Sequence, residues 1–207
     1  SSSDSSAPGG QFDRRNELSI RFGGYGTGSK IVLVGEDEIA KGGPAFGVRF
    51  LSNLTPSIGF GFEVDRLDTT PNESTKLITN AITTTKLTST ELLAVFRIRF
   101  MQERFRPYLL AGAGVHHTRM TIDSRPRPGF IWTDTFTNET RSLVDSQKSG
   151  GALSLEFGFD HHLNESISLG AFCGWHFASE QTYDATAAGR RLGGSGVKGA
   201  FNGVMLG

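Results

Sequence analysis

Charged residues recur at every second position inside segments that are otherwise apolar. The set contains both signs and comprises Arg21, Arg49, Glu63, Asp65, Arg97, Arg99 and Glu156, with Glu17 and Glu91 at equivalent positions. Residues two apart lie on one face of a strand, so each strand would carry its charges on a single face. If these faces line a closed interior, an unpaired charge there is costly, so the charges must pair or keep water. The pattern predicts a network of internal salt bridges.

The histidines, by contrast, do not form a convincing chemical site. They are His116 with His117, His161 with His162, and His176. Adjacent residues on a strand point to opposite faces, so neither pair can chelate a metal, and further ligands at metal-site spacing are missing. His176, Ser179 and Glu180 are residue types found in hydrolases, but the spacing predicts His176 and Ser179 on opposite faces. We therefore expect no catalytic residue, no metal site and no cofactor.

The element that organises these positions is a predicted hairpin over Glu91–Val115. One face of its first strand is apolar and comprises Leu92, Ala94, Phe96, Ile98 and Phe100. A charged turn follows at Gln102–Arg106, Pro107 opens the next strand, and Tyr108 is expected at a membrane interface. Each half is close to the roughly 9 to 11 residues that cross a bilayer, whereas soluble strands average about 5 or 6. The length favours a membrane barrel.

Six further segments alternate in the same way, which gives about eight strands in all. They are Glu17–Gly26, Gly43–Leu51, Ser57–Asp68, Gly151–Asp160, Ser166–Phe177 and Val197–Leu206. The alternation predicts these aromatic residues to face lipid: Phe22, Phe60, Phe62, Phe96, Phe100, Phe157 and Trp175. The connections alternate between long and short. The long ones are 27–41, 69–90, 123–149 and 178–196, and we expect the second to be a surface loop with its own hairpin. Outer-membrane barrels have this rhythm of loops and turns.

Composition agrees with a single β-domain after a polar leader. The 207 residues include 27 Gly, and the formal net charge is zero, so there is no electrostatic footprint for nucleic acid. No apolar run approaches the roughly 18 residues of a spanning helix. Residues 1–16 begin SSSDSSAPGG and are predicted to be a disordered Ser-rich leader, with the barrel over 17–207.

One motif carries a family resemblance. Phe105-Arg106-Pro107-Tyr108 followed by Leu109-Leu110-Ala111-Gly112-Ala113-Gly114-Val115 resembles the fifth strand of OmpA-like and OmpX-like bacterial outer-membrane barrels. The resemblance implies an all-β, up-and-down antiparallel transmembrane barrel in the bacterial outer membrane, with short periplasmic turns and long extracellular loops. One departure is the ending Met205-Leu206-Gly207, because such barrels commonly end on an aromatic residue.

The expected function is non-enzymatic. Such a barrel would act as a membrane anchor, or as a structural or interaction protein, through its extracellular loops or periplasmic leader. The expected partners are outer-membrane lipid and other envelope proteins. An aromatic cluster in the third long loop, Phe130, Trp132 and Phe136, either forms an exposed interaction surface or packs over the barrel mouth, and the sequence favours neither.

Three alternatives remain open on the sequence. The first is a narrow ion or small-solute channel lined by the charged set. The second is a lipid A-modifying hydrolase centred on His176 and Ser179, since outer-membrane lipid A deacylases resemble this fold and use His, Ser and Glu. The third is a soluble lipocalin-like carrier, which would turn the apolar faces inward around a ligand and leave the arginines outside.

Overall fold

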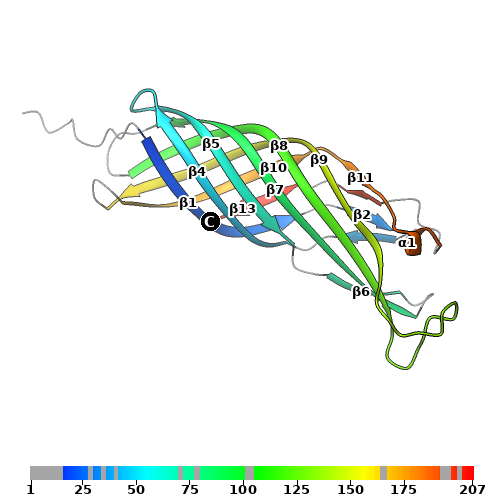
Figure 1. Cartoon of the computed structure of the whole chain (residues 1–207). Coiled ribbons are helices and arrows are strands. Elements are labelled where there is room, and N and C mark those ends of the chain that lie inside the picture. Colours follow the sequence, from blue (N-terminus) through cyan, green and yellow to red (C-terminus); the bar gives the residue numbers. More distant parts are fainter. Residues whose placement is uncertain are drawn as a thin grey trace, which may run out of the picture.

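Eight antiparallel strands form a closed barrel in the computed structural model of the chain (Figure 1). The structure describes residues 16–27, 30–33, 36–39, 42–69, 72–76, 80–100, 105–163, 167–191, 197–199 and 202–207. The barrel strands are β1 (Asn16–Thr27), β4 (Gly43–Asn53), β5 (Ile58–Asp68), β7 (Ala81–Arg99), β8 (Phe105–Pro126), β9 (Arg141–His162), β10 (Ser168–Ala178) and β13 (Gly203–Leu206). Sequential strands pair with one another, and the β1–β13 pairing closes the ring. Closure removes the exposed sheet edges, which satisfies the backbone without a disulfide.

Three of these strands are much longer than the others. β7 has 19 residues, and β8 and β9 have 22 each, and all three run on past the ring at one end (Figure 1). The projecting part, here called the strand extension, comprises 81–90, 116–126 and 141–150, with β6 (Asn72–Lys76) paired to the start of β7. A second, four-stranded sheet lies at this end and contains β2 (Lys30–Leu33), β3 (Glu36–Ile39), β11 (Gln181–Tyr183) and β12 (Val197–Gly199).

Apolar residues are buried in two clusters inside the molecule. One lies within the barrel and comprises Leu51, Leu93, Val95, Tyr108, Leu110 and Ala152. The other joins the extension to the upper ends of the barrel strands and comprises Tyr25, Ala45, Leu67, Leu87, Met120, Ile122, Leu143, Val144, Ala178, Tyr183, Val197 and Met205. We call the second set the upper core. A register shift next to Ile122 and Asp123 marks a bulge, which lets the consecutive residues Leu143 and Val144 both point inward.

The strand count and the up-and-down topology predicted from the sequence are confirmed. The hairpin expected within 69–90 is confirmed too, since β6 pairs with the start of β7, but two loops were predicted too long. Much of 69–90 and 123–149 is strand, because Ala81–Thr90 continues β7, β8 runs to Pro126, and β9 begins at Arg141. The predicted last strand, Val197–Leu206, is also wrong as one element. Its first part, β12, joins the second sheet, where Val197 is buried in the upper core, and only β13 closes the barrel.

The predicted leader, 1–16, lies outside the described residues apart from Asn16, which begins β1. The one helix in the described part of the chain is α1 (Ala187–Arg191), and no helix there is both long and apolar enough to cross a membrane.

Candidate functional site

Charged side chains from four strands meet in the middle of the barrel. Arg21 of β1 contacts Glu63 of β5 at 2.5 Å and Asp65 at 3.3 Å, and it also pairs with Glu156 of β9. Arg49 of β4 pairs with Glu63, and its Nη2 lies 2.9 Å from Glu156 Oε2. All five side chains are at most 5% exposed. The network therefore links opposite sides of the ring across the interior.

Strand register explains why these residues meet. Arg49 is the direct cross-strand partner of Glu63, and Gly47 is the partner of Asp65. A Cβ on Gly47 would lie 1.8 Å from Asp65 Oδ1, so the glycine leaves the space that the carboxylate occupies. Larger residues at 47 would displace Asp65 from Arg21.

A second charged cluster lies toward the end of the barrel that has the short turns. Glu17 receives hydrogen bonds from Arg97 at 2.7 Å, Arg99 at 2.5 Å and Asn53 Nδ2 at 2.7 Å. Arg97 also lies 3.7 Å from Asp160 and donates to Asn53 Oδ1 at 3.2 Å. Both arginines are buried. This cluster fills the interior next to that end.

Tyr108 connects the two clusters, which corrects the sequence prediction that placed it at a membrane interface. Its hydroxyl donates to Glu156 Oε1 at 2.8 Å, and its ring centroid lies 5.8 Å from the Arg97 guanidinium carbon. Tyr108 is only 4% exposed. The reason is parity, because Tyr108 shares its face of β8 with Leu110, which points into the barrel.

Two of the histidines, His116 and His176, are buried higher in the interior, next to the upper core, whereas His117 and His161 are exposed. His176 Nδ1 lies 2.9 Å from Glu91 Oε2, and its ring meets Tyr25 edge-on. Ser179 is not bonded to His176: it accepts from Gln181 at 2.9 Å and lies 3.4 Å from His116 Nε2. The predicted alternation between 176 and 179 does not apply, since β10 ends at Ala178. Within the described ranges no three His, Cys, Asp or Glu side chains gather as a metal site.

The apolar faces of the barrel strands point outward. Each aromatic residue predicted to face lipid is exposed, with fractions from 42% for Trp175 to 68% for Phe22. This is the reverse of a soluble carrier, whose apolar faces would enclose a ligand. An apolar groove of about 530 Å³ crosses this outer surface over β5 and β7–β10, where Ala94, Ala111 and Ala113 lie between larger side chains.

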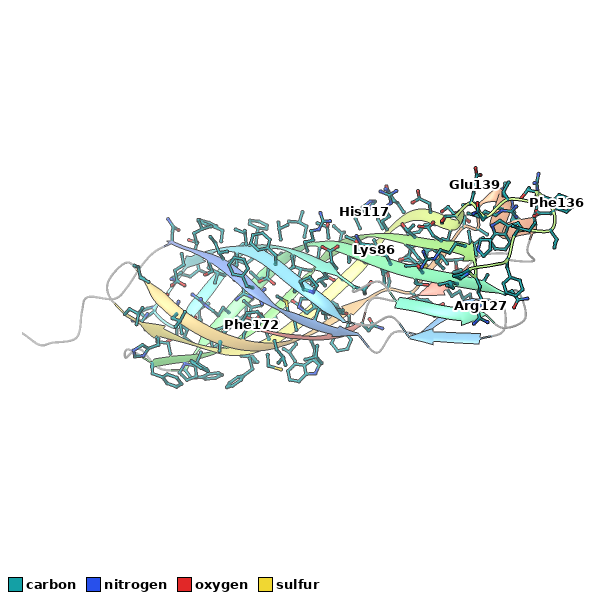
Figure 2. The ribbon with its side chains drawn as sticks, turned by 90° about the horizontal axis from the view of Figure 1, so that it is seen from below. Lys86, His117, Arg127, Phe136, Glu139 and Phe172 are labelled. Carbon is teal, nitrogen blue, oxygen red and sulfur yellow. The ribbon has the colours of Figure 1, made fainter. Side chains whose placement is uncertain are left out.

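The turn between β8 and β9, residues 127–140, is here called the tip (Figure 2). The three aromatic residues of the predicted cluster differ in exposure: Trp132 is 8% exposed, whereas Phe130 and Phe136 are 48% and 77% exposed. The Trp132 ring is covered by Arg141, whose guanidinium carbon lies 4.6 Å from the ring centroid. The indole donates to the Glu139 carbonyl at 2.8 Å. Trp132 thus acts as a small core for the tip.

An ion pair between Arg141 and Asp134 holds the guanidinium over the Trp132 ring. Arg141 donates two hydrogen bonds to Asp134, at 2.9 and 2.8 Å. The hydrogen bond from Arg141 is the main cause that lowers the pKa of Asp134 below its ordinary value. The tip therefore keeps its charged brace at neutral pH. No signal in the sequence separated Trp132 from its exposed neighbours, because the covering residue, Arg141, lies beyond the loop.

Comparison with known proteins gives a fold but not a family. No protein-family model matches the chain, and no curated protein matches it. Among solved structures, OprG from Pseudomonas aeruginosa is 15% identical, with a TM-score of 0.56 over 91% of this chain and 90% of OprG. Ail from Yersinia pestis is 11% identical, with a TM-score of 0.45 over 94% of this chain and 98% of Ail. Neisserial surface protein A is 12% identical, with a TM-score of 0.45 over 93% of this chain and 96% of that protein.

The likeness to OprG extends over nearly the whole of both chains. The chain has the fold of a small bacterial outer-membrane β-barrel. The resemblance predicted from Phe105–Val115 is thereby confirmed at the level of the fold.

Proposed function

We propose that the chain is a non-enzymatic protein of the bacterial outer membrane, in which the barrel is an anchor and the strand extension with its tip is the interacting part. The observation that carries this proposal is an abrupt change in the outward-facing residues of β7–β9. Leu92 pairs with Val115 in the last apolar row, and the next outward row is Thr90, His117 and Ser149. Below the change the outer surface suits hydrocarbon, and above it the surface suits water.

The height of the apolar surface supports a bilayer. On β7 the outward apolar residues run from Leu92 to Phe100, and on β8 they run from Phe105 to Val115. These stretches match the roughly 9 to 11 residues that a tilted strand needs to cross the hydrocarbon region. Outer-membrane barrels carry short turns on the periplasmic side and longer structures outside. The extension is therefore assigned to the cell exterior.

The packed interior supports an anchor rather than a channel. The two charged clusters are cross-linked through Tyr108, and the upper core lies across the other end. Eight strands enclose an interior that side chains are just able to fill. The hydrolase alternative is not favoured either. Ser179 lies 3.4 Å from His116, but the other ring nitrogen of His116 is bonded to Thr118, whereas the Glu91 carboxylate is bonded to His176.

Cysteine labelling on intact cells tests the orientation. In a Cys173→Ser background, Gln147→Cys lies on the exposed extension and should react with a membrane-impermeant maleimide. Leu54→Cys lies in the turn between β4 and β5 and should react only after the outer membrane is permeabilised. Equal labelling of both positions in intact cells would contradict the orientation.

Planar-bilayer recording tests the sealed interior. The purified full chain should insert without producing steady single-channel currents. Regular conductance steps that change on Arg49→Ala would instead establish a channel.

A further inference from the structure

The ring is closed by strand pairing over only part of its height. β13 lies between β1 and β10, but it pairs with β1 only over Gly24–Thr27 and with β10 only over Cys173–His176. Gly207 adds one step to the ladder: its N–H donates to the Phe172 carbonyl at 3.1 Å, and its carbonyl accepts from Phe172 N at 2.8 Å. Figure 1 shows this end of the chain partway along the barrel, beside β1.

Below Gly207 the edges of β1 and β10 face each other across a gap, here called the seam. Among the residues that the structure describes, Asn16–Gly23 pairs only with β4, and Ser168–Ala171 pairs only with β9. Every second residue of an antiparallel strand directs its N–H and C=O to the same side, so each edge presents a row of donors and acceptors to the seam.

The seam lies in the apolar belt. Leu18 of β1 and Leu169 of β10 face outward beside it and are 72% and 69% exposed. Hydrocarbon offers no water to satisfy backbone groups, and open sheet edges therefore do not persist inside a bilayer. An unpaired strand edge is also a template for another strand.

Exposure on both faces shows that a neighbouring strand is missing. On the outer face, Phe22 of β1 is 68% exposed, whereas Phe46, its partner on β4, is 45% exposed. On the inner face, none of the residues in Ser168–Ala171 is buried, although β5 buries every second residue from Gly59 to Leu67. One added strand would cover both faces.

The interior behind the seam is nevertheless filled. The guanidinium carbon of Arg21 lies 4.1 Å from the centroid of the Phe172 ring, so a β1 side chain meets a β10 side chain across the gap. Arg21 is also held by Glu63 and Glu156 and is 5% exposed. The seam therefore lacks backbone pairing and side cover, which an extended segment supplies, and it is not a cavity for a small ligand.

We infer that the seam is a strand-acceptor site, which binds one extended segment of a partner polypeptide antiparallel to both β1 and β10. One strand fits, because β13 occupies the same gap higher up and pairs with both neighbours. Addition of a strand to a free sheet edge is a recurring mode of peptide recognition. The inference goes beyond the proposed function and needs only that the barrel spans a bilayer.

The register defines the chemistry of the segment. Continuing the β1–β13 register past Gly207 places seven residues of the segment opposite Asn16–Phe22. Directly opposed residues share a face, so those opposite Leu18, Ile20 and Phe22 meet hydrocarbon and should be apolar. The residues between them face the filled interior and should be small and polar. Residues 1–15 do not have this alternation, since SSSDSSAPGGQFDRR contains a single large apolar side chain.

Disulfide trapping of a synthetic peptide tests the inference. The probe is acetyl-Leu-Thr-Cys-Ser-Leu-Thr-Phe-amide, whose cysteine would lie opposite residue 20. The full chain in detergent micelles, with Ile20→Cys in a Cys173→Ser background, should form a mixed disulfide with it. A scrambled peptide of the same composition should be trapped about tenfold less, because its apolar side chains no longer share one face. Equal trapping of the two peptides would overturn the inference.

A matched control on the same outer face measures capture by the micelle alone. Phe62 is 55% exposed, but β5 has a paired strand on each side. Phe62→Cys in the same background should trap both peptides only at the level of the scrambled peptide. A heat-modifiable gel shift shows that each variant has folded. Equal trapping at positions 20 and 62 would mean that the peptide binds micelles and not the seam.

Filling the seam in advance gives a second readout. A variant that carries Leu-Thr-Val-Ser-Leu-Thr-Phe after Gly207 should trap about tenfold less peptide, because the added residues would pair with the same edges. Its midpoint of urea unfolding should also rise. A scrambled tail of the same composition should do neither. Trapping that the alternating tail leaves unchanged would overturn the inference.

The same variants distinguish other occupants. Disulfide dimers of Ile20→Cys that the peptide does not reduce would assign the seam to a second copy of the chain. Trapping that appears only after deletion of residues 1–15 would assign it to the leader. Either result would overturn the inference. Absence of trapping, with Gln147→Cys still labelled on intact cells and Leu54→Cys still protected, would overturn the acceptor site and leave the proposed function standing.

Discussion

The lower and upper halves of β7–β9 belong to the same strands but have opposite polarity. In the barrel, Arg97 and Glu156 point inward and Phe96 points outward. In the extension, Met120 is buried on the inner face, and Lys86 is exposed on the outer face. The backbone ladder is continuous through the change. The medium outside the sheet, hydrocarbon or water, therefore decides which face carries charge, and the strand pairing does not.

The two interiors also differ in what holds them together. The barrel interior depends on paired charges, which gain little over an apolar core when intact but are expensive when broken. The upper core depends on apolar packing, which loses energy in proportion to what is removed. Substitutions in the two halves should therefore lower the free energy of unfolding in different ways.

Removing Arg21 should have the largest effect. Arg21→Ala would leave Glu63, Asp65 and Glu156 short of their shared cation, which should cost about 3 to 5 kcal/mol of unfolding free energy. Urea unfolding in lipid vesicles measures this loss. The control Arg119→Ala breaks an exposed pair with Asp145, which water screens, and should leave the unfolding free energy nearly unchanged. Equal losses in the two variants would mean that the network is hydrated rather than buried.

Truncation in the upper core should come next. Met120 is fully buried among apolar side chains, so Met120→Ala should cost about 2 to 5 kcal/mol. Hydrogen exchange should show the loss in the extension, with the barrel strands still protected. If the amides of the barrel strands lost their protection at the same time, the two halves would be one cooperative unit.

A charge on the outer face should be costly below the polarity change and harmless above it. Phe96→Arg places a cation in the apolar belt and should cost about 2 to 4 kcal/mol near the bilayer midplane. Thr84→Arg lies on the same face of the same strand, in the extension, opposite Asp123, and should fall within about 0.5 kcal/mol of the parent. Vesicle-based unfolding compares the two. Similar costs at both positions would mean that the apolar belt does not lie in a bilayer.

The same polarity change explains what could be predicted from the sequence. In the barrel, large apolar residues occupy every second position of the outer face and the charged residues lie between them, so the inward placement of Arg49 and the outward placement of Phe157 follow from parity. In the extension, Thr83 and Thr85 face inward while Thr84 faces outward. A Thr-rich strand with polar residues on both faces has the composition of a loop, and for this reason much of the extension was assigned to loops.

Contacts between residues far apart in the sequence could not be predicted either. The meeting of Arg21 with Glu156, and the cover that Arg141 places on Trp132, depend on ring closure and on the β8–β9 register. Alternation identifies the face of a residue but not its partner across the barrel. The hydrolase alternative loses support for a related reason, because His176 meets Glu91, three strands away around the ring, and not Ser179.

Acid should produce the smallest effect, and at the tip it should act through one ion pair. Asp134 is exposed, and its hydrogen bond from Arg141 lowers its pKa in the folded protein. A group with a depressed folded pKa contributes stability above its ordinary value, and the contribution is lost as the pH falls through the folded value. The brace on Trp132 should therefore persist at neutral pH and weaken only below the ordinary Asp range of about 3.9. Trp132 fluorescence in the Trp175→Phe background should report this transition, and Asp134→Asn should remove it. A transition retained in Asp134→Asn would assign the acid sensitivity to the barrel interior instead, where carboxylates are buried in the charged clusters, and the tip would then lose its separate, locally braced character.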